Sequence, residues 1–222
     1  MHSFGETYLE HREKLEFSIE QHQQLFNICR EVGIGYSVSV WDVQSAQNII
    51  SLEPDYIKIP SAMNENYKLL DYLFENFNKD IHISLGMISK ENRETLYKYL
   101  EDKKDRVVMY WTTSGYPVPF DELYLLELVE LKKIFPRISF SGHHRGIAID
   151  IAAFVLGNVE FIERHFTLDR TSKGSDHSAS LEPLGLQRLC RDLKAVQKSL
   201  SFKKIDYTED EKINMKKLKV KG

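Results

Sequence analysis

The stretch RISFSGHHRGIAIDIAAFVLGNVEFIERHFTLD, residues 137–169, contains the unit that decides the fold. Its two ends, 137–146 and 159–169, are runs rich in β-branched and aromatic residues, which predict strands. The apolar segment 147–157 between them predicts a helix. A helix between two strands predicts a parallel pair joined by a right-handed crossover.

The same alternation fills most of the chain. Four earlier runs predict strands, at 33–42, 55–62, 80–87 and 106–117. Helical patterns are found at 18–32, 43–53, 66–77, 89–103, 122–135 and 184–200. Six strand–helix units in a row are typical of either a parallel barrel or a doubly wound sheet. We favour a TIM-barrel-like α/β barrel, because polar or small residues follow each strand, where barrel enzymes carry their chemistry.

The bulk properties exclude several classes of protein. The chain has 222 residues, enough for one sizeable domain or two small ones, and its net charge of −3 gives no basic excess for nucleic-acid binding. No apolar run is long enough to span a bilayer, and the polar start is unlike a secretory signal. The two cysteines, Cys29 and Cys190, lie far apart. We therefore expect a cytoplasmic protein that binds neither nucleic acid nor membrane.

Two histidines mark the ends of the last two predicted strands. Because strand side chains alternate, Glu163 and His165 share one face and Arg164 lies on the other. By the same rule His144 points away from His143. Two imidazoles from adjacent strands, with carboxylates nearby, suit a divalent transition metal that polarises a carbonyl. The alternative is that each histidine is a hydrogen-bonded structural residue.

Lys58 lies inside an apolar predicted strand. A buried lysine needs a partner, which is either an anionic ligand or an acid on a neighbouring strand. Several serines stand near the strand ends, and with Lys58 they form the set of charge and hydroxyl donors that binds phosphate or carboxylate. Each serine alone is equally well explained as a helix cap. Tyr116, which precedes Pro117, either packs its loop or contacts a substrate.

Several motifs together resemble the N-acetylneuraminate (sialic acid) synthase family. They are YIKIPSA, SLGM, SGYP, SGHHRGIAIDIAAFVLG and IERHFTLDRTSKGSDHSASLEP, and the resemblance runs from about residue 5 to residue 200. It implies a TIM barrel that condenses phosphoenolpyruvate with an N-acylated amino sugar, such as N-acetylmannosamine, to a nonulosonic acid and releases phosphate. It also implies a homodimer and a divalent metal, Mn²⁺ first, with Mg²⁺ and Co²⁺ as alternatives.

The resemblance assigns roles residue by residue. His143 and His165 match the metal ligands, while Tyr116 and Asp176 match residues that face the amino sugar. These four are the expected catalytic residues. The expected phosphoenolpyruvate-binding residues are Lys58, Ser61, Ser84, Ser114, Ser141 and Ser39. No role is assigned to His144, and His177 is expected to face solvent.

The chain also departs from the family pattern. The first two strand–helix units and the C-terminal antifreeze-like domain have no counterpart, so we expect a barrel truncated at both ends with open edges at 33–42 and 159–169. We expect a partial barrel domain at 1–203 and a polar, mobile tail at 204–222. The alternative to an active synthase is a catalytically inactive remnant or subunit that retains metal or anion binding. A weaker one is a related synthase acting on a phosphorylated sugar.

Overall fold

A computed structural model describes residues 4–7, 10 and 13–220 and contains one six-stranded sheet. The strands are all parallel and follow one another in chain order across the sheet. They are β1 (Ser37–Ser39), β2 (Tyr56–Ile59), β3 (Ile81–Ser84), β4 (Val107–Trp111), β5 (Ile138–Gly142) and β6 (Ile162–Arg164). The prediction of parallel strands joined by helices is thus confirmed.

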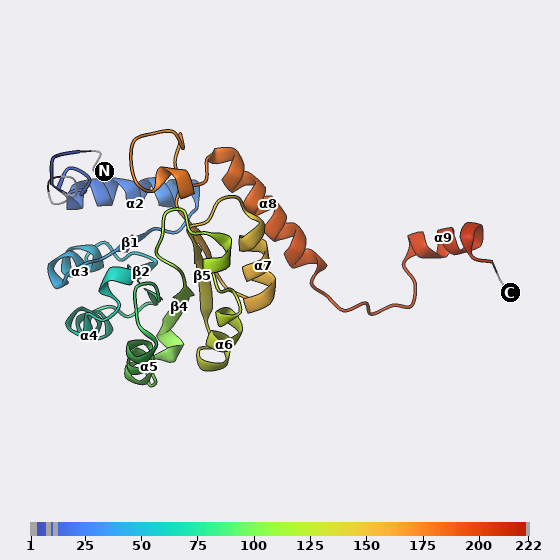
Figure 1. The fold of residues 1–222 in the computed structure, drawn as a ribbon, viewed down its shortest axis with the longest axis horizontal. Coiled ribbons are helices and arrows are strands. Elements are labelled where there is room, and N and C mark those ends of the chain that lie inside the picture. The colour runs from blue at the N-terminus through green and yellow to red at the C-terminus, as the bar shows by residue number, and fades with distance from the viewer. Residues whose placement is uncertain (1–3, 8–9, 11–12, 221–222) are drawn as a thin grey trace.

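Helices connect the strands and cover the outside of the sheet (Figure 1). The connecting helices are α3 (Val43–Ile50), α4 (Tyr67–Asn76), α5 (Lys90–Tyr99), α6 (Glu127–Ile134) and α7 (Ala148–Gly157). Helix α2 (Ile19–Val32) precedes β1, α8 (Pro183–Ser199) follows β6 and contacts α7, and α9 (Glu209–Leu218) lies in the tail. Ser89 caps α5, since its hydroxyl accepts from the Asn92 N–H at 3.1 Å. Helix α6 begins later than predicted, because Tyr124 has a φ of 47° and interrupts the helical backbone.

Strand β6 is much shorter than the predicted run 159–169. After Arg164 the chain leaves β5 and pairs instead with the segment before α8, where the Leu181 N–H donates to the His165 carbonyl at 2.8 Å. The alternation of side chains along a strand does not predict this change of partner, because an apolar strand pattern is compatible with pairing to β5 or to the segment before α8. The loop 166–180 is thereby anchored at both ends beside β6.

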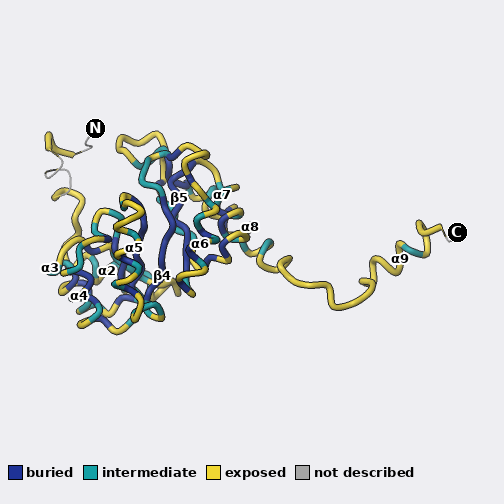
Figure 2. Tube along the Cα trace, turned by 60° about the horizontal axis from the view of Figure 1, so that its bottom comes forward, coloured by how far each residue is buried: buried dark blue, intermediate teal, exposed yellow. Residues whose placement is uncertain are grey.

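The two faces of the sheet carry different side chains. Alternate strand residues such as Ile57, Ile59, Ile81 and Ile83 are fully buried and form the apolar core with the helices. Figure 2 shows this buried layer at the centre of the molecule. The other alternate set, which includes Lys58, is polar and faces the concave interior of the sheet.

The sheet is curled, so that non-neighbouring strands meet across its interior. Lys58 on β2 and Glu163 on β6 form an ion pair at 2.7 Å, although three strands lie between them in the sheet. The described residues therefore form a half-barrel, with β1 and β6 as the two outermost strands. The barrel-like architecture is confirmed to that extent, and the truncation stays a prediction.

The last part of the chain runs away from the sheet (Figure 1). The sequence analysis predicted only a polar extension here, but Glu209–Leu218 form helix α9. Thr208 caps it, with its hydroxyl accepting from the Glu211 N–H and the Glu211 carboxylate accepting from the Thr208 N–H. The outer ends of the two predicted regions, residues 1–3 and 221–222, lie outside the described residues. Among the residues that are described, no helix is long and apolar enough to cross a membrane.

Candidate functional site

A pocket of about 540 Å³ opens at the carboxyl ends of the strands. It brings together all of the predicted site residues except one, and these are Ser39, Lys58, Ser61, Ser84, Tyr116, Ser141, His143, His165 and Asp176. The exception is Ser114. Residues from six strands or the loops after them converge here, which is the position of the active site in parallel barrels.

Ser114 lies just behind this pocket, beside Ser61. A Cβ atom added to Gly86 would stand 2.4 Å from the Ser114 hydroxyl and 2.6 Å from the Ser61 hydroxyl, so the two serines crowd the same glycine. Only glycine allows the backbone to come this close. The Gly86 N–H donates to the Ser61 hydroxyl at 3.2 Å, and the Asn64 amide donates to the carbonyls of Ser84 and Gly86 at 2.9 Å. Asn64, which the sequence analysis did not single out, therefore fixes the turn that carries Ser84.

Lys58 and Ser141 converge on one carboxylate, that of Glu163. The Lys58 ammonium donates to one oxygen and the Ser141 hydroxyl to the other, both at 2.7 Å. The Lys58 side chain is 6% exposed, whereas that of Glu163 is 42% exposed. One of the two sequence alternatives for Lys58, a salt bridge, is therefore present, but its acid comes from across the half-barrel rather than from a neighbouring strand.

Burial and pairing act in opposite directions on this ion pair. Burial lowers the pKa of Lys58, and the charge of Glu163 partly restores it. Burial raises the pKa of Glu163, but the charge of Lys58 and the hydrogen bonds from Lys58 and Ser141 leave that pKa below its ordinary value. Each group of the pair therefore favours the charged form of the other, against the effect of burial.

Aromatic rings support Lys58 from below. Its ammonium lies 4.0 Å from the centre of the Tyr110 ring, a cation–π contact. The Tyr110 hydroxyl is 2.9 Å from His82 Nδ1, and the His82 ring stacks on Tyr56 with centroids 3.8 Å apart. His82 is fully buried, and burial, with the nearby Lys58 charge, lowers its pKa to about 3. A neutral histidine and a tyrosine thus form the floor under the lysine.

The rings of His143 and His165 meet edge to face in the pocket, with centroids 5.1 Å apart. His143 Nδ1 lies 2.8 Å from the Thr113 carbonyl, so this nitrogen carries the hydrogen and Nε2 keeps its lone pair. Burial lowers the pKa of His143, which favours the neutral ring. Tyr116 packs on both rings, at 4.4 and 5.4 Å.

Imidazole nitrogen is a ligand type that divalent transition metals accept. A neutral imidazole oriented by a backbone carbonyl is the usual form of a histidine ligand. Within the described ranges, no group of three or more histidine, cysteine or acidic side chains is arranged as a metal site. Asp176 lies near the pair, with its carboxylate 3.6 Å from His165 Nδ1.

The prediction that His177 faces solvent is wrong. His177 is half-buried, and its Nδ1 lies 2.8 Å from the Thr167 hydroxyl. Thr167 also donates to the Asp169 carbonyl at 3.1 Å. These bonds tie the loop that carries Asp176 back to the segment after β6.

His144 has a clear structural place on the opposite face of the sheet. It lies with Asp150 and Arg164 in a sealed cluster between the sheet and α7, and the three side chains are at most 2% exposed. Arg164 pairs with Asp150, and its guanidinium also donates to the carbonyls of His144 and Gly146 at 2.6 and 2.8 Å. A Cβ atom on Gly142 would stand 2.8 Å from the His144 ring, so the cluster also requires that glycine.

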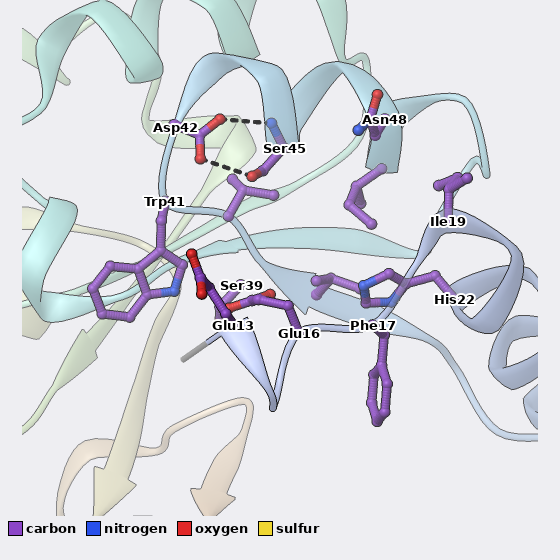
Figure 3. A pocket seen from close by; sticks show the side chains of 13 residues that line it. Glu13, Glu16, Phe17, Ile19, His22, Ser39, Trp41, Asp42, Ser45 and Asn48 are labelled. Carbon is purple, nitrogen blue, oxygen red and sulfur yellow. Dashed lines mark hydrogen bonds between the residues drawn. The ribbon is translucent and has the colours of Figure 1, made fainter. Parts of the chain in front are cut away.

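A second pocket of about 530 Å³ adjoins the first beside β1. Ser39 and Trp41 line both. Figure 3 shows its other walls, which are the segment with Glu13, Glu16 and Phe17 on one side and α3 on the other. Asp42 caps α3 there, and its two oxygens accept from the N–H and hydroxyl of Ser45 at 2.7 and 2.8 Å.

Sequence reasoning placed Glu163 on the correct face but gave it no role. Other residues that line the pocket also carried no predicted role, and they include Met87, Thr112 and Ser175. The Thr112 hydroxyl lies 3.4 Å from His143 Nδ1. Alternation along β4 would have placed Thr112 two residues beyond Tyr110 on the interior face.

The sequence of the chain is similar to those of known proteins over most of its length. The model of the NeuB family matches residues 2–204. Human N-acetylneuraminate-9-phosphate synthase is 37% identical over 201 residues, which cover 90% of this chain and 55% of that protein. The N,N'-diacetyllegionaminic acid synthase of Campylobacter jejuni is 33% identical over 216 residues, or 95% of this chain and 64% of that protein. The chain thus spans about half to two thirds of the length of these curated relatives.

The fold has a similar solved counterpart. The sialic acid synthetase of Leptospira borgpetersenii, determined in complex with citrate, superposes with a TM-score of 0.81 at 26% sequence identity. The match covers 96% of this chain and 75% of that one.

Proposed function

The chain belongs to the NeuB family, and its relatives include synthases of sialic and legionaminic acids. On that premise we propose that it joins phosphoenolpyruvate to an N-acylated amino sugar, N-acetylmannosamine or a close analogue. The products would be a nonulosonic acid and inorganic phosphate. The observation that carries this proposal is the convergence of a buried lysine, several serine hydroxyls and two facing histidines in one pocket.

The anionic substrate would be held by the lysine and the serines. Lys58 supplies a positive charge, and hydroxyls come from Ser61, Ser84 and Ser141 around it. A fixed cation with several hydroxyl donors suits the phosphate and carboxylate of phosphoenolpyruvate. Holding both groups orients the methylene carbon of the enol, and such positioning lowers the barrier to its attack on an aldehyde.

The amino sugar would lie nearer the mouth of the pocket. Tyr116 is 41% exposed and offers a ring face there, and Asp176 offers a carboxylate that accepts from sugar hydroxyls. His143 and His165 are the residues that would hold a divalent metal, Mn²⁺ first. When bound, the metal supplies Lewis-acid polarisation of the sugar's aldehyde oxygen.

The proposed reaction balances as an aldol-type condensation with water. The enol carbon of phosphoenolpyruvate forms a bond to the aldehyde carbon of the open-chain sugar, whose oxygen becomes a hydroxyl. Water adds to the resulting oxocarbenium carbon, and the bond from that carbon to the phosphate oxygen breaks. The electrostatic task of the pocket is to hold the developing and departing charges, which fixed donors perform without reorganisation.

We propose further that residues 1–203 work as one synthase domain, with 204–222 as an extension, and that the protein acts as a cytoplasmic homodimer. The separate course of the tail in Figure 1 supports the division. Gel filtration with light scattering would measure the oligomeric state, and a monomer at working concentration would contradict that part.

Phosphate release tests the proposed reaction. We expect inorganic phosphate to form only when phosphoenolpyruvate, N-acetylmannosamine and Mn²⁺ are all present, and a chelator to abolish it. Titration of Mn²⁺ should show binding to the wild type and a loss of at least about tenfold in affinity for His165→Ala, since one ligand is removed. Equal Mn²⁺ binding by both proteins, or no phosphate release with any N-acylated amino sugar, would contradict the proposal.

A further inference from the structure

The anion-binding donors of the pocket are engaged by an anion of the protein itself. Lys58 and Ser141, two of the expected ligand contacts, both donate to the Glu163 carboxylate at 2.7 Å. Lys58 is the only lysine or arginine among the described residues that line this pocket. Lys58, the cation that an anionic ligand would contact, is therefore already paired with Glu163.

The two partners differ in their freedom to move. The Lys58 side chain is 6% exposed and is held over the Tyr110 ring, so the ammonium stays where it is. The Glu163 side chain is 42% exposed and reaches the pocket from a strand of only three residues. If the pair opens, the carboxylate can turn toward solvent, whereas the lysine cannot follow it without leaving its aromatic floor.

We propose that Glu163 is an internal competitor for the anion site, and that an anionic ligand binds by taking its place on Lys58 and Ser141. The inference rests on the proposed function, because it concerns the same site. Every anion meets the same barrier of displacing Glu163, so the apparent affinity of each falls by the same factor. Weak, abundant anions are thereby kept out, while a ligand with many contacts still binds.

The matched substitution Glu163→Gln tests this directly. Glutamine keeps the shape and can still bond to Ser141, but it removes the charge that pairs with Lys58. We expect isothermal titration at constant pH to show phosphoenolpyruvate, inorganic phosphate and pyruvate all binding tighter to the variant, by a similar factor of about ten or more. Unchanged or weaker binding of all three overturns the proposal.

A second carboxylate in the same pocket serves as control. Asp176 lines the pocket, and its carboxylate lies 3.6 Å from His165 Nδ1 rather than beside Lys58. If charge removal acted only through space, Asp176→Asn would tighten binding as well, and the dianions would gain more than pyruvate in both variants. That result overturns displacement, and a uniform gain confined to Glu163→Gln supports it.

The wild type offers a test that does not depend on the variant's folding. A crystal structure with phosphate or phosphoenolpyruvate bound should show Lys58 Nζ more than about 4 Å from the Glu163 carboxylate, beyond ion-pair range. A ligand bound beside an intact pair overturns the inference. If Glu163→Gln binds phosphate more tightly but the wild type turns over no phosphoenolpyruvate, the proposed function is rejected and this inference stands. If the wild type turns over phosphoenolpyruvate but Glu163→Gln binds phosphate no more tightly, the inference is rejected and the proposed function stands.

Discussion

Strands β5 and β6 carry a charged cluster on each face, and adjacent residues supply the two. Glu163 points inward to Lys58, while Arg164 points outward to Asp150 and His144. The inner pair is 6% and 42% exposed, but the outer pair is 2% and 0% exposed. Similar ion pairs therefore stand in two different environments, one open to a pocket and one sealed under α7.

The difference in exposure between the two clusters suggests different roles, the outer cluster in stability and the inner pair in ligand binding. In the outer cluster the two terminal nitrogens of the guanidinium donate to a carboxylate and to backbone carbonyls, and the side chain is closed off from any pocket. In the inner cluster the carboxylate is half-exposed and replaceable. We expect changes to the outer cluster to affect folding, and changes to the inner one to affect ligands.

Breaking the outer cluster should have the largest effect. Asp150→Ala leaves Arg164 buried without its counter-charge, which should lower the free energy of unfolding by about 3–5 kcal/mol. Urea denaturation followed by circular dichroism measures this. The exposed pair Lys133–Glu130 is the control, and Lys133→Ala should cost about 0.5 kcal/mol or less. A loss below about 1 kcal/mol for Asp150→Ala would show that the sealed cluster is not a stability element.

Breaking the inner pair should instead affect the reaction. Lys58→Met removes the only lysine or arginine that lines the pocket in the described part of the chain, and it should lower kcat/KM for phosphoenolpyruvate by about a hundredfold, or about 2.7 kcal/mol. The free energy of unfolding should change by about 1 kcal/mol or less, because Glu163 is left half-exposed to water. Lys68→Met, on the exposed face of α4, is the matched control and should change neither quantity. If Lys58→Met lowered the free energy of unfolding strongly but left kcat/KM unchanged, the inner pair would be a stability element and not a binding one.

The floor under the inner pair should respond to acid. His82 has a pKa of about 3 in the folded protein against an ordinary 6.5, so below pH 6.5 the unfolded chain binds a proton that the folded chain does not. Stability should therefore fall as the pH falls from 6.5 toward 3, by at most about 1.4 kcal/mol per pH unit from this residue. Comparing unfolding of wild type and His82→Phe between pH 7 and pH 5 isolates this slope. Parallel curves for the two proteins would count against a buried neutral His82.

Substitutions of two serines on β5 should give the smallest effects, one on anion affinity and the other on stability. Ser141→Ala removes the hydroxyl that bonds to Glu163 and should change anion affinity by about fivefold, near 1 kcal/mol, with little effect on unfolding. Ser139, on the same face, accepts from the Phe161 N–H at 3.1 Å and is fully buried. Ser139→Ala should therefore lower the free energy of unfolding by about 1–3 kcal/mol and leave anion affinity unchanged. Titration calorimetry and urea unfolding of both variants would reveal any exchange of these roles.

Much of this arrangement follows from alternation along the strands. The period of two placed Glu163 and His165 on one face and Arg164 on the other, and the pocket contains the first two but not the third. It also turned His144 away from His143, as the sealed cluster bears out. Strand order and the position of the pocket followed from the repeated strand–helix units.

The remainder depends on three-dimensional closure, which a sequence pattern does not describe. One of the two alternatives for Lys58 was an acidic partner on a neighbouring strand, but the curl of the sheet brings that partner from β6. The bond between His177 and Thr167 depends on the path of the loop 166–180. Helix α9 is a different kind of miss, because Thr208 and Glu211 form a capping box that the sequence already contains.

The Lys58–Glu163 contact also has a consequence for how the protein acquires its chemistry. Every strand pairing joins consecutive units of the chain, so the sheet can assemble from short-range steps. The contact between Lys58 and Glu163 spans 105 positions. During synthesis the N-terminal units emerge first, and β2 is available long before β6. Lys58 is therefore without its carboxylate partner in the early stages of synthesis. The pocket acquires its charge pattern only when β6 docks on the sheet.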